Sequence, residues 1–306
     1  MIPLPDLGET PFLAAIGPRD RSWSRVAAMV SGGLALSFIF GLIATFVVME
    51  GLLKVGIDLN SQSTSFHEPT LIRAALYVLE LSLALAAAAL GALVAARWIF
   101  ARPIRSWITA AARFRWLQLA QGFGLAFVGV ALVSQAVGVF KGGSLVDGAP
   151  IFESAEPILR RLVYVLANAA GFLLAAWAEE AVFRGYVLQQ AAALTRRPYA
   201  ALWISGVLFA LIHLEFSPWA LAARTIIGAA FAWTALRLGG LEFAIGAHLA
   251  NNLMIALFGA PMLPGASADP GDALGVATET LMAVYLAVCA ELIRRRAARR
   301  ALAATA

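Results

Sequence analysis

The chain has 306 residues, of which 61% are hydrophobic and 13% are charged, and its mean hydropathy is +0.81. Soluble domains average about 45–50% apolar and about 25% charged residues, so this composition excludes a water-soluble fold. The net charge of +5 would fit a nucleic-acid-binding protein, but the arginines stand in short segments between apolar runs, as in membrane proteins, and we expect no nucleic acid partner.

Apolar runs follow one another along the chain, and each approaches the roughly 20 residues that a membrane helix needs. They cover residues 27–53, 71–97, 117–140, 158–190, 199–215, 219–237, 241–260 and 273–293. We therefore predict an all-α, polytopic membrane bundle of about eight transmembrane helices. It would comprise a cytoplasmic tail at 1–25, a single transmembrane domain at 26–293 and a basic cytoplasmic tail at 294–306.

The charged residues alternate between successive connections. Arginines precede the first run, follow the eighth, and stand after the second, fourth and sixth runs. Acids occupy the other connections, at Asp58, Glu68, Asp147, Glu153, Glu156, Asp269 and Asp272. Since Lys and Arg mark cytoplasmic loops, this alternation predicts that both termini are cytoplasmic. The excess of Arg over Lys and the abundance of Ala are typical of a GC-rich bacterial genome, which indicates the cell (inner or plasma) membrane.

The connection between the second and third runs, from Arg102 to Trp116, interleaves Arg with Ile, Trp and Phe. This pattern fits an amphipathic helix that lies at the cytoplasmic interface. It equally fits a basic connector with aromatic anchors, in which Trp107 would belong to the interfacial belt.

Two adjacent acids, Glu179 and Glu180, stand in the fourth run, and Arg184 follows four residues after the second acid. Residues four apart share a helix face, so Arg184 is expected to pair with Glu180. Glu179 points about 100° away around the helix and lacks this partner. An unpaired acid in an apolar helix is costly, which makes Glu179 a candidate general base. The alternative is a structural Glu–Arg pair with Glu179 reaching toward the membrane edge.

Two further pairs of residues, each of which contains a histidine, have the same spacing. Phe209 and His213 are four residues apart in the fifth run, and His248 and Asn252 are four apart in the seventh, so each pair is expected on one helix face. Imidazole and amide groups both donate hydrogen bonds, so His248 and Asn252 could hold a developing oxyanion. His213 would also suit a packing role, and His248 with Asn252 would also suit an interhelical hydrogen bond.

The connections bring these pairs to similar depths in the predicted bundle. A turn near Arg196 would make the fourth and fifth runs antiparallel neighbours, with Glu179 and His213 at similar distances from it. His248 lies shortly after a connection that is expected on the same side of the membrane. We therefore expect Glu179, His213 and His248 to line one shared cavity.

Together these patterns resemble the CAAX prenyl protease and bacteriocin-processing family, also called the Abi or CPBP family of intramembrane glutamic-type endopeptidases. That family carries Glu-Glu-x-x-x-Arg, Phe-x-x-x-His and His-x-x-x-Asn motifs. This chain matches them with Glu179, Glu180 and Arg184, with Phe209 and His213, and with His248 and Asn252. The resemblance covers residues 158–260, which would be the catalytic core helices.

The resemblance implies an endopeptidase that hydrolyses a peptide bond of a membrane-associated protein or peptide. Glu179 would take a proton from a water molecule that His213 orients, and His248 with Asn252 would hold the oxyanion. Glu180 and Arg184 would position Glu179. Apart from the resemblance, we expect Phe209 and Arg224 to contact the substrate, although Arg224 would equally suit a structural ion pair or a position at the membrane interface. We expect no cofactor. The partners would be membrane lipid and the protein or peptide substrate.

Three alternatives stay open at this point. Glu179, His213 and His248 together match the two-His, one-carboxylate set of catalytic zinc sites, so a zinc-dependent version of the peptidase is conceivable. A non-enzymatic immunity or scaffold protein could use the same polar cluster for structure. A transporter with a proton relay is disfavoured, because the sequence shows no inverted repeat.

Overall fold

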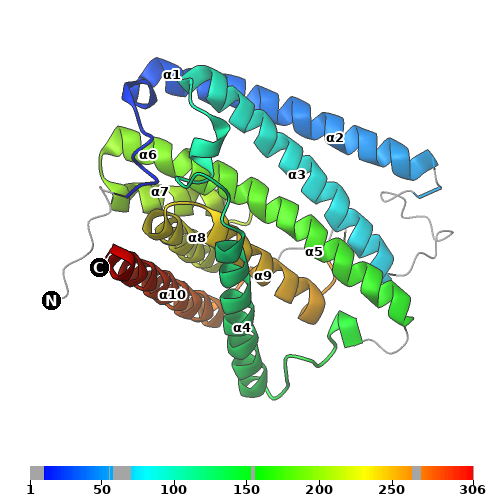
Figure 1. The fold of residues 1–306 in the computed structure, drawn as a ribbon. Coiled ribbons are helices and arrows are strands. Elements are labelled where there is room, and N and C mark those ends of the chain that lie inside the picture. Colours follow the sequence, from blue (N-terminus) through cyan, green and yellow to red (C-terminus); the bar gives the residue numbers. More distant parts are fainter. Residues whose placement is uncertain (1–9, 55, 58–69, 153–155, 264–269, 306) are drawn as a thin grey trace.

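The computed structural model describes residues 10–54, 56–57, 70–152, 156–263 and 270–305. Within these ranges the chain forms helices and connecting loops and contains no strand, only an isolated bridge between Thr109 and Gly240. The all-α prediction is confirmed (Figure 1).

The helices follow the predicted apolar runs closely. They are α1 (Trp23–Ala28), α2 (Leu34–Lys54), α3 (Thr70–Phe100), α4 (Trp116–Phe140), α5 (Ile158–Glu180), α6 (Leu188–Thr195), α7 (Pro198–Leu211), α8 (Pro218–Leu238), α9 (Glu242–Phe258) and α10 (Ala273–Thr305). Two π-helical segments, η2 (Met29–Gly33) and η5 (Ala181–Val187), join α1 to α2 and α5 to α6. Three short 3-10 helices, η1 (Pro18–Arg21), η3 (Ile104–Trp107) and η4 (Pro150–Phe152), lie in the loops.

Six helices among the described residues are long and apolar enough to cross a membrane, so the chain is a multi-pass membrane protein. The other two predicted spans correspond to α7 and α9, which have only 14 and 17 residues. The fifth run is shorter than predicted because α7 ends at Leu211, and Leu214 adopts a φ of +55° before Pro218 begins α8. The number of membrane crossings therefore stays a prediction.

The predicted orientation of the two termini also stays a prediction. Of the acids on which it depends, Asp58, Glu68, Glu153 and Asp269 lie outside the described residues, as do residues 1–9 of the N-terminal tail. Residues 306 and 264–269 lie outside them as well.

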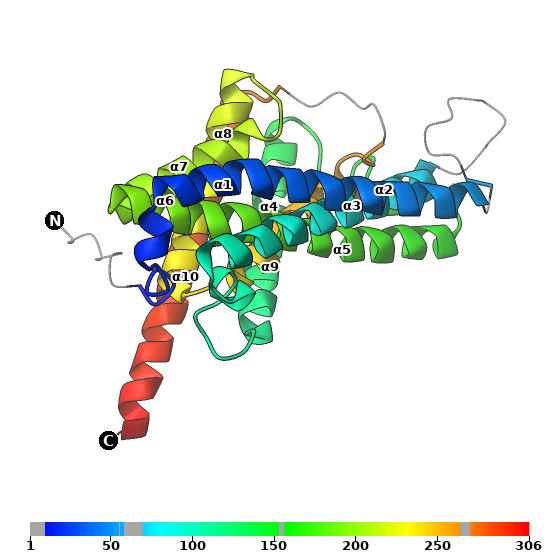
Figure 2. The ribbon, with the colours of Figure 1, turned by 90° about the horizontal axis from the view of Figure 1, so that it is seen from above.

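Helices α2, α3 and α5 lie side by side in both ribbon views, and α8 and α10 run across them (Figure 2). None of the residues of α2 is buried, as expected for a helix that faces lipid. Helix α9, by contrast, is largely buried and packs most extensively against α4. The most interior helix is therefore the one that carries His248.

Glycines allow α4 and α9 to approach each other closely. A Cβ atom at Gly122 would lie 2.1 Å from the carbonyl oxygen of Phe243, and one at Gly246 would lie 2.0 Å from that of Leu119. Small residues at such crossings let helix backbones pack together in membranes. The position of α9, and with it the position of its polar residues, is thus tightly constrained.

The connection from Arg102 to Trp116 differs from both sequence interpretations. It contains only the short helix η3, and Trp107 is fully buried instead of lying at the interface. Arg102 donates hydrogen bonds to Asp20 at 2.7 Å and to Gln189 at 2.6 Å, and its guanidinium lies 3.8 Å from the centre of the Trp107 ring. These distant partners draw the segment into the protein, so the expected amphipathic surface helix is wrong.

Candidate active site

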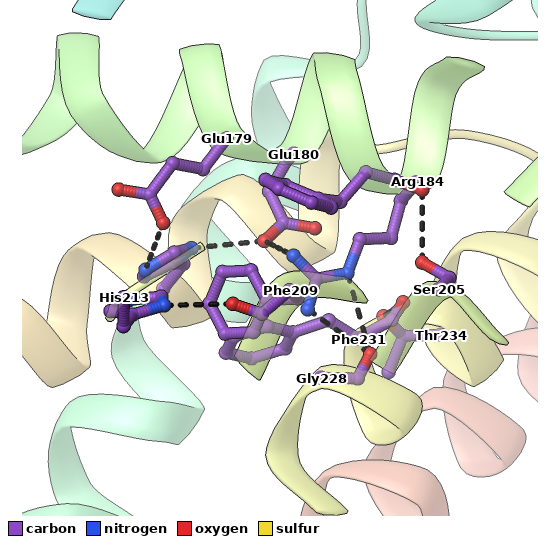
Figure 3. Close-up of polar contacts among 11 residues, drawn as sticks. Glu179, Glu180, Arg184, Ser205, Phe209, His213, Gly228, Phe231 and Thr234 are labelled. Atoms are coloured by element: carbon purple, nitrogen blue, oxygen red, sulfur yellow. Dashed lines mark hydrogen bonds and ion pairs between the residues drawn. The ribbon is translucent and has the colours of Figure 1, made fainter. Parts of the chain in front are cut away.

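The predicted acids lie where the fourth span departs from regular α-helix. Glu179 and Glu180 end α5, and Arg184 lies in the π-helical segment η5. Such π segments occur frequently at functional sites because they change the direction of side chains along a helix. Ser205 from α7 donates a hydrogen bond of 2.9 Å to the carbonyl of Phe183 within η5, so this hydroxyl serves the backbone (Figure 3).

Glu180 and Arg184 form the ion pair that their spacing predicted. Arg184 Nη1 donates to Glu180 Oε1 at 2.9 Å, and both side chains are completely buried. Nε and Nη2 of Arg184 donate to the carbonyl of Gly228 at 3.3 and 3.1 Å. The guanidinium also lies 4.1 Å from the ring centre of Phe209 and 5.3 Å from that of Phe231 (Figure 3). Arg184 is therefore fixed in one position.

His248 connects the two carboxylates. Its Nδ1 lies 2.9 Å from Glu180 Oε1, and its Nε2 lies 3.7 Å from Glu179 Oε2. The imidazole stacks on Phe231, with ring centres 5.2 Å apart. Because a carboxylate accepts the hydrogen bond, Nδ1 carries the proton of the shorter contact. Glu180 thus holds the ring so that Nε2 faces Glu179.

Glu179 is the carboxylate that remains after these pairings. Its side chain is 20% exposed, and Oε2 is enclosed without a hydrogen-bond partner among the described residues. The 3.7 Å separation from His248 Nε2 is longer than a hydrogen bond. This carboxylate oxygen is therefore available to a substrate group or to water.

His213 lies in the turn after α7, not on the helix face that its spacing with Phe209 predicted, because the helix already ends at Leu211. Its Nδ1 lies 2.8 Å from the carbonyl oxygen of Phe209. Since that oxygen can only accept, Nδ1 is the donor, and Nε2 of the neutral ring is an acceptor. The ring packs edge-on against the Phe209 ring at 4.8 Å (Figure 3).

One cavity of about 450 Å³, hereafter the polar cavity, receives most of the predicted site residues. Its lining includes Glu179, Phe209, His213, Arg224, His248, Asn251 and Asn252. Glu180 and Arg184 do not line it; they lie behind His248, where both are fully buried. Arg224 reaches the cavity, and its Nη1 has no hydrogen-bond partner within the described part of the chain. Most of the predicted residues thus line the cavity, whereas Glu180 and Arg184 lie behind its wall.

Sequence reasoning missed three participants. Phe231 supports the His248 ring, the Gly228 carbonyl accepts two bonds from Arg184, and Glu279 from α10 also lines the polar cavity. Glu279 could have been found as an ionisable residue within an apolar run. A backbone carbonyl and one phenylalanine among many carry no such signal.

The set of side chains proposed for the zinc alternative does not form a metal-binding cluster. Within the described ranges, no group of three or more His, Cys, Asp and Glu side chains is spaced to hold a metal ion. A catalytic zinc site would need three protein ligands about 2.0–2.2 Å from one point.

The segment that contains these residues is similar to known proteins. Residues 161–254 match the family model described as type II CAAX prenyl endopeptidase Rce1-like. All seven motif residues, from Glu179 to Asn252, fall within that match.

A protein of Bacillus subtilis (strain 168), described as uncharacterized protein YyaK, is 27% identical over 175 residues. This similarity covers 55% of the chain and 56% of the relative, so the chain matches just over half of that protein's length. No solved structure matches the chain. The family resemblance drawn from the three motifs is nevertheless confirmed over residues 161–254, the part of this multi-pass membrane protein that matches the model of the Rce1-like type II CAAX prenyl endopeptidases, a protease family.

Proposed function

We propose that the protein is an intramembrane endopeptidase that cleaves a membrane-associated protein or peptide in the polar cavity. One observation carries the proposal. A carboxylate oxygen of Glu179 without a hydrogen-bond partner faces Nε2 of His248 across 3.7 Å, in a cavity that His213 and Asn252 also line. Buried polar groups are usually paired, so an unpaired carboxylate oxygen in a cavity is typical of a reactive site.

Glu179 acts as the general base in this proposal. Its carboxylate removes one proton from a water molecule, and the water oxygen forms a bond to the carbonyl carbon of the scissile peptide. His213 orients that water by accepting its other hydrogen at Nε2, since Nδ1 is engaged with the Phe209 carbonyl. The proton on Glu179 then passes to the amide nitrogen as the C–N bond breaks, which releases a carboxyl and an amine product.

His248 and Asn252 stabilise the charge that develops on the carbonyl oxygen. A donor at Nε2 of His248 requires a ring that carries protons on both nitrogens, because Nδ1 already donates to Glu180. Glu180 and Glu179 provide the negative charge that surrounds such a ring. Asn252 supplies an amide donor from the next turn of α9.

Glu180 and Arg184 are positioning residues. They do not line the polar cavity, and they act by holding His248 through its Nδ1. Glu180 keeps its place because Arg184 is itself bound to the Gly228 carbonyl. The same arrangement of a base oriented by a second group recurs in other hydrolytic sites.

Arg224 and Phe209 complete the proposal for substrate contact. Arg224 Nη1 has no hydrogen-bond partner among the described residues and lines the cavity, so it can bind a carboxylate of the substrate. Phe209 shapes the cavity wall between His213 and His248. We place the enzyme in the cell membrane, with lipid and a protein or peptide substrate as its partners and with no resident metal.

The test is cleavage of a library of quenched fluorescent decapeptides by the purified protein in detergent micelles. Glu179→Gln should abolish cleavage while the thermal unfolding temperature remains that of the wild type. Glu80→Gln, which removes an intramembrane carboxylate of α3 that does not line the polar cavity, is the matched control. Equal cleavage by wild type and Glu179→Gln would refute the proposal. A large loss of stability in Glu179→Gln would favour the non-enzymatic alternative, in which the cluster is structural.

A further inference from the structure

A second cavity, of about 500 Å³, adjoins the first and is hereafter the apolar cavity. It lies between the first membrane helix (Trp23–Lys54, which comprises α1, η2 and α2), α3 and η5, and it also reaches the turn after α7. Its walls include Met29 and Leu34 from the first helix, Ala88 and Ala89 from α3, and Val182 from η5. Its volume falls in the range of about 300–1,000 Å³ that is typical of ligand sites.

The two cavities meet at the proposed catalytic base. Leu85, Glu179 and His213 line both of them. A chain that extends from one cavity into the other therefore passes the Glu179 carboxylate and the His213 ring. Since Glu179 is the group proposed to activate water, the bond presented at this junction is the bond that would be cut.

Both cavities have apolar walls, but they differ in the polar side chains that line them. Apart from the shared residues, the polar side chains of the apolar cavity are the hydroxyl-bearing Ser37 and Tyr186. The polar cavity adds two charged side chains, Arg224 and Glu279, and it also contains His248 and both asparagines of α9. A ligand that pairs with these polar side chains and also fills the apolar cavity is therefore polar at one end and apolar at the other.

From this contrast we propose that the substrate is a polypeptide in which a short run of apolar residues stands directly on one side of the scissile bond and polar residues stand on the other. The apolar run occupies the apolar cavity, and the polar residues contact Arg224 and Asn251. The inference rests on the proposed peptidase function and adds the substrate class. A free lipid could fill the apolar cavity, but it would present no amide bond to Glu179.

A single pair of variants tests the role of the apolar cavity in selecting substrates. Ser37→Phe places a ring in the cavity, whereas Ala35→Phe adds the same ring to an exposed position of α2 that lines neither cavity. Both are assayed on the decapeptide library, with cut sites read by mass spectrometry. Cut sites of the wild type should show apolar residues on one side only. Ser37→Phe should lower kcat/KM for such peptides by about tenfold or more relative to Ala35→Phe.

A second variant distinguishes an effect of the cavity on substrate choice from a loss of activity through misfolding. Met29 is buried and lines the apolar cavity, so Met29→Ala enlarges it. This variant should shift the preferred apolar residues toward larger side chains such as Trp and Phe, a gain that an unfolded protein cannot show. Cut sites without one-sided apolar preference, or equal rates in the two phenylalanine variants, would overturn the inference while leaving the peptidase function intact.

Occupancy can be measured without cleavage. A decapeptide with photo-leucine residues at one end is irradiated with the Glu179→Gln variant, and the adducts are mapped. Adducts should form on the first membrane helix and on residues 85–92, and Ser37→Phe should remove them. The inference would be refuted if Glu179→Gln gave equal adducts with and without Ser37→Phe. It would also be refuted if phospholipid displaced the adducts and an unlabelled apolar peptide did not, since the cavity would then bind lipid. Adducts as expected, without any Glu179-dependent cleavage in the library, would instead refute the peptidase function.

Discussion

Two arginine–carboxylate pairs among the described residues have both side chains buried, one beside the polar cavity and one at the short helix η1. Arg184 pairs with Glu180 and lies over Phe209, while Arg102 pairs with Asp20 and lies over Trp107. Around Arg102 the remaining partner is the neutral side chain of Gln189. Around Arg184 there follow an imidazole and a second carboxylate that opens to a cavity.

This comparison shows that a buried ion pair does not by itself mark a reactive site. Both pairs satisfy the requirement that a buried charge be paired and hydrogen-bonded. What distinguishes the first region is the additional acid, Glu179, for which the arrangement leaves no full partner. We therefore interpret the Arg102 region as a structural anchor and the Arg184 region as the support of the proposed active site.

The largest expected effect comes from removing the additional acid. Glu179→Gln should lower kcat/KM by about 10²–10⁴-fold, the usual contribution of a general base, because the amide cannot accept the proton of water. Initial rates on a cleaved decapeptide measure the effect, with thermal unfolding as the control for folding. A rate within threefold of the wild type would remove the distinction between the two regions.

Breaking each ion pair separately sharpens the comparison. Arg184→Met and Arg102→Met should each destabilise the folded protein by about 3–5 kcal/mol, because each leaves a buried carboxylate without its partner. Only Arg184→Met should also lower the kcat of the fraction that remains folded, since only Glu180 holds His248. Unfolding by SDS titration and activity per folded molecule are the two measurements. A comparable loss of kcat in both variants would contradict the structural assignment of Arg102.

Asn252→Ala tests the oxyanion contact, with an expected loss of about 10²–10³-fold in kcat and little change in KM. Asn251→Ala is the neighbouring control, since that side chain lines the same cavity but carries no proposed role in holding the oxyanion. Steady-state kinetics on one peptide separate the two parameters. If Asn252→Ala raised KM alone, the residue would bind substrate without stabilising the developing charge.

The smallest expected effect is that of metal chelation. Incubation with 1,10-phenanthroline followed by removal of the chelator should leave kcat/KM unchanged, because the proposed step uses Glu179 as the base instead of a metal-bound hydroxide. The measurement is the initial rate before and after added Zn²⁺. Inactivation that Zn²⁺ reverses would instead support the zinc-dependent version of the peptidase.

Local features of both regions could be predicted from the sequence, whereas contacts between distant segments could not. The pairing of Glu180 with Arg184 follows from four-residue spacing within one helix. The contact between Glu180 and His248 depends on how α5 packs against α9, which no spacing encodes. The burial of Trp107 could not be predicted either, because it follows from tertiary packing and not from the residues next to it in the sequence.

The same difference between local and tertiary features applies to the helices themselves. Apolar runs predicted the helices well, because hydropathy is a local property. Helix α7 ends before His213, and Leu214 then adopts a positive φ; no residue pattern indicates either this end or the π segment between Glu180 and Leu188. These two irregularities decide the direction of the predicted site residues, which is why the residues could be named but their contacts could not.

The π segment η5 also sets the rotational phase between the two regions compared above. Upstream of it stand Glu179 and Glu180; downstream, Gln189 and Gln190 bind Arg102 and the Asp20 backbone. If the same residues wound as regular α-helix, at about 100° per residue, the glutamines would be rotated relative to the acids. Either the acids or the glutamines would then miss their partners, so the winding of this stretch is as constrained as the identity of its charged residues.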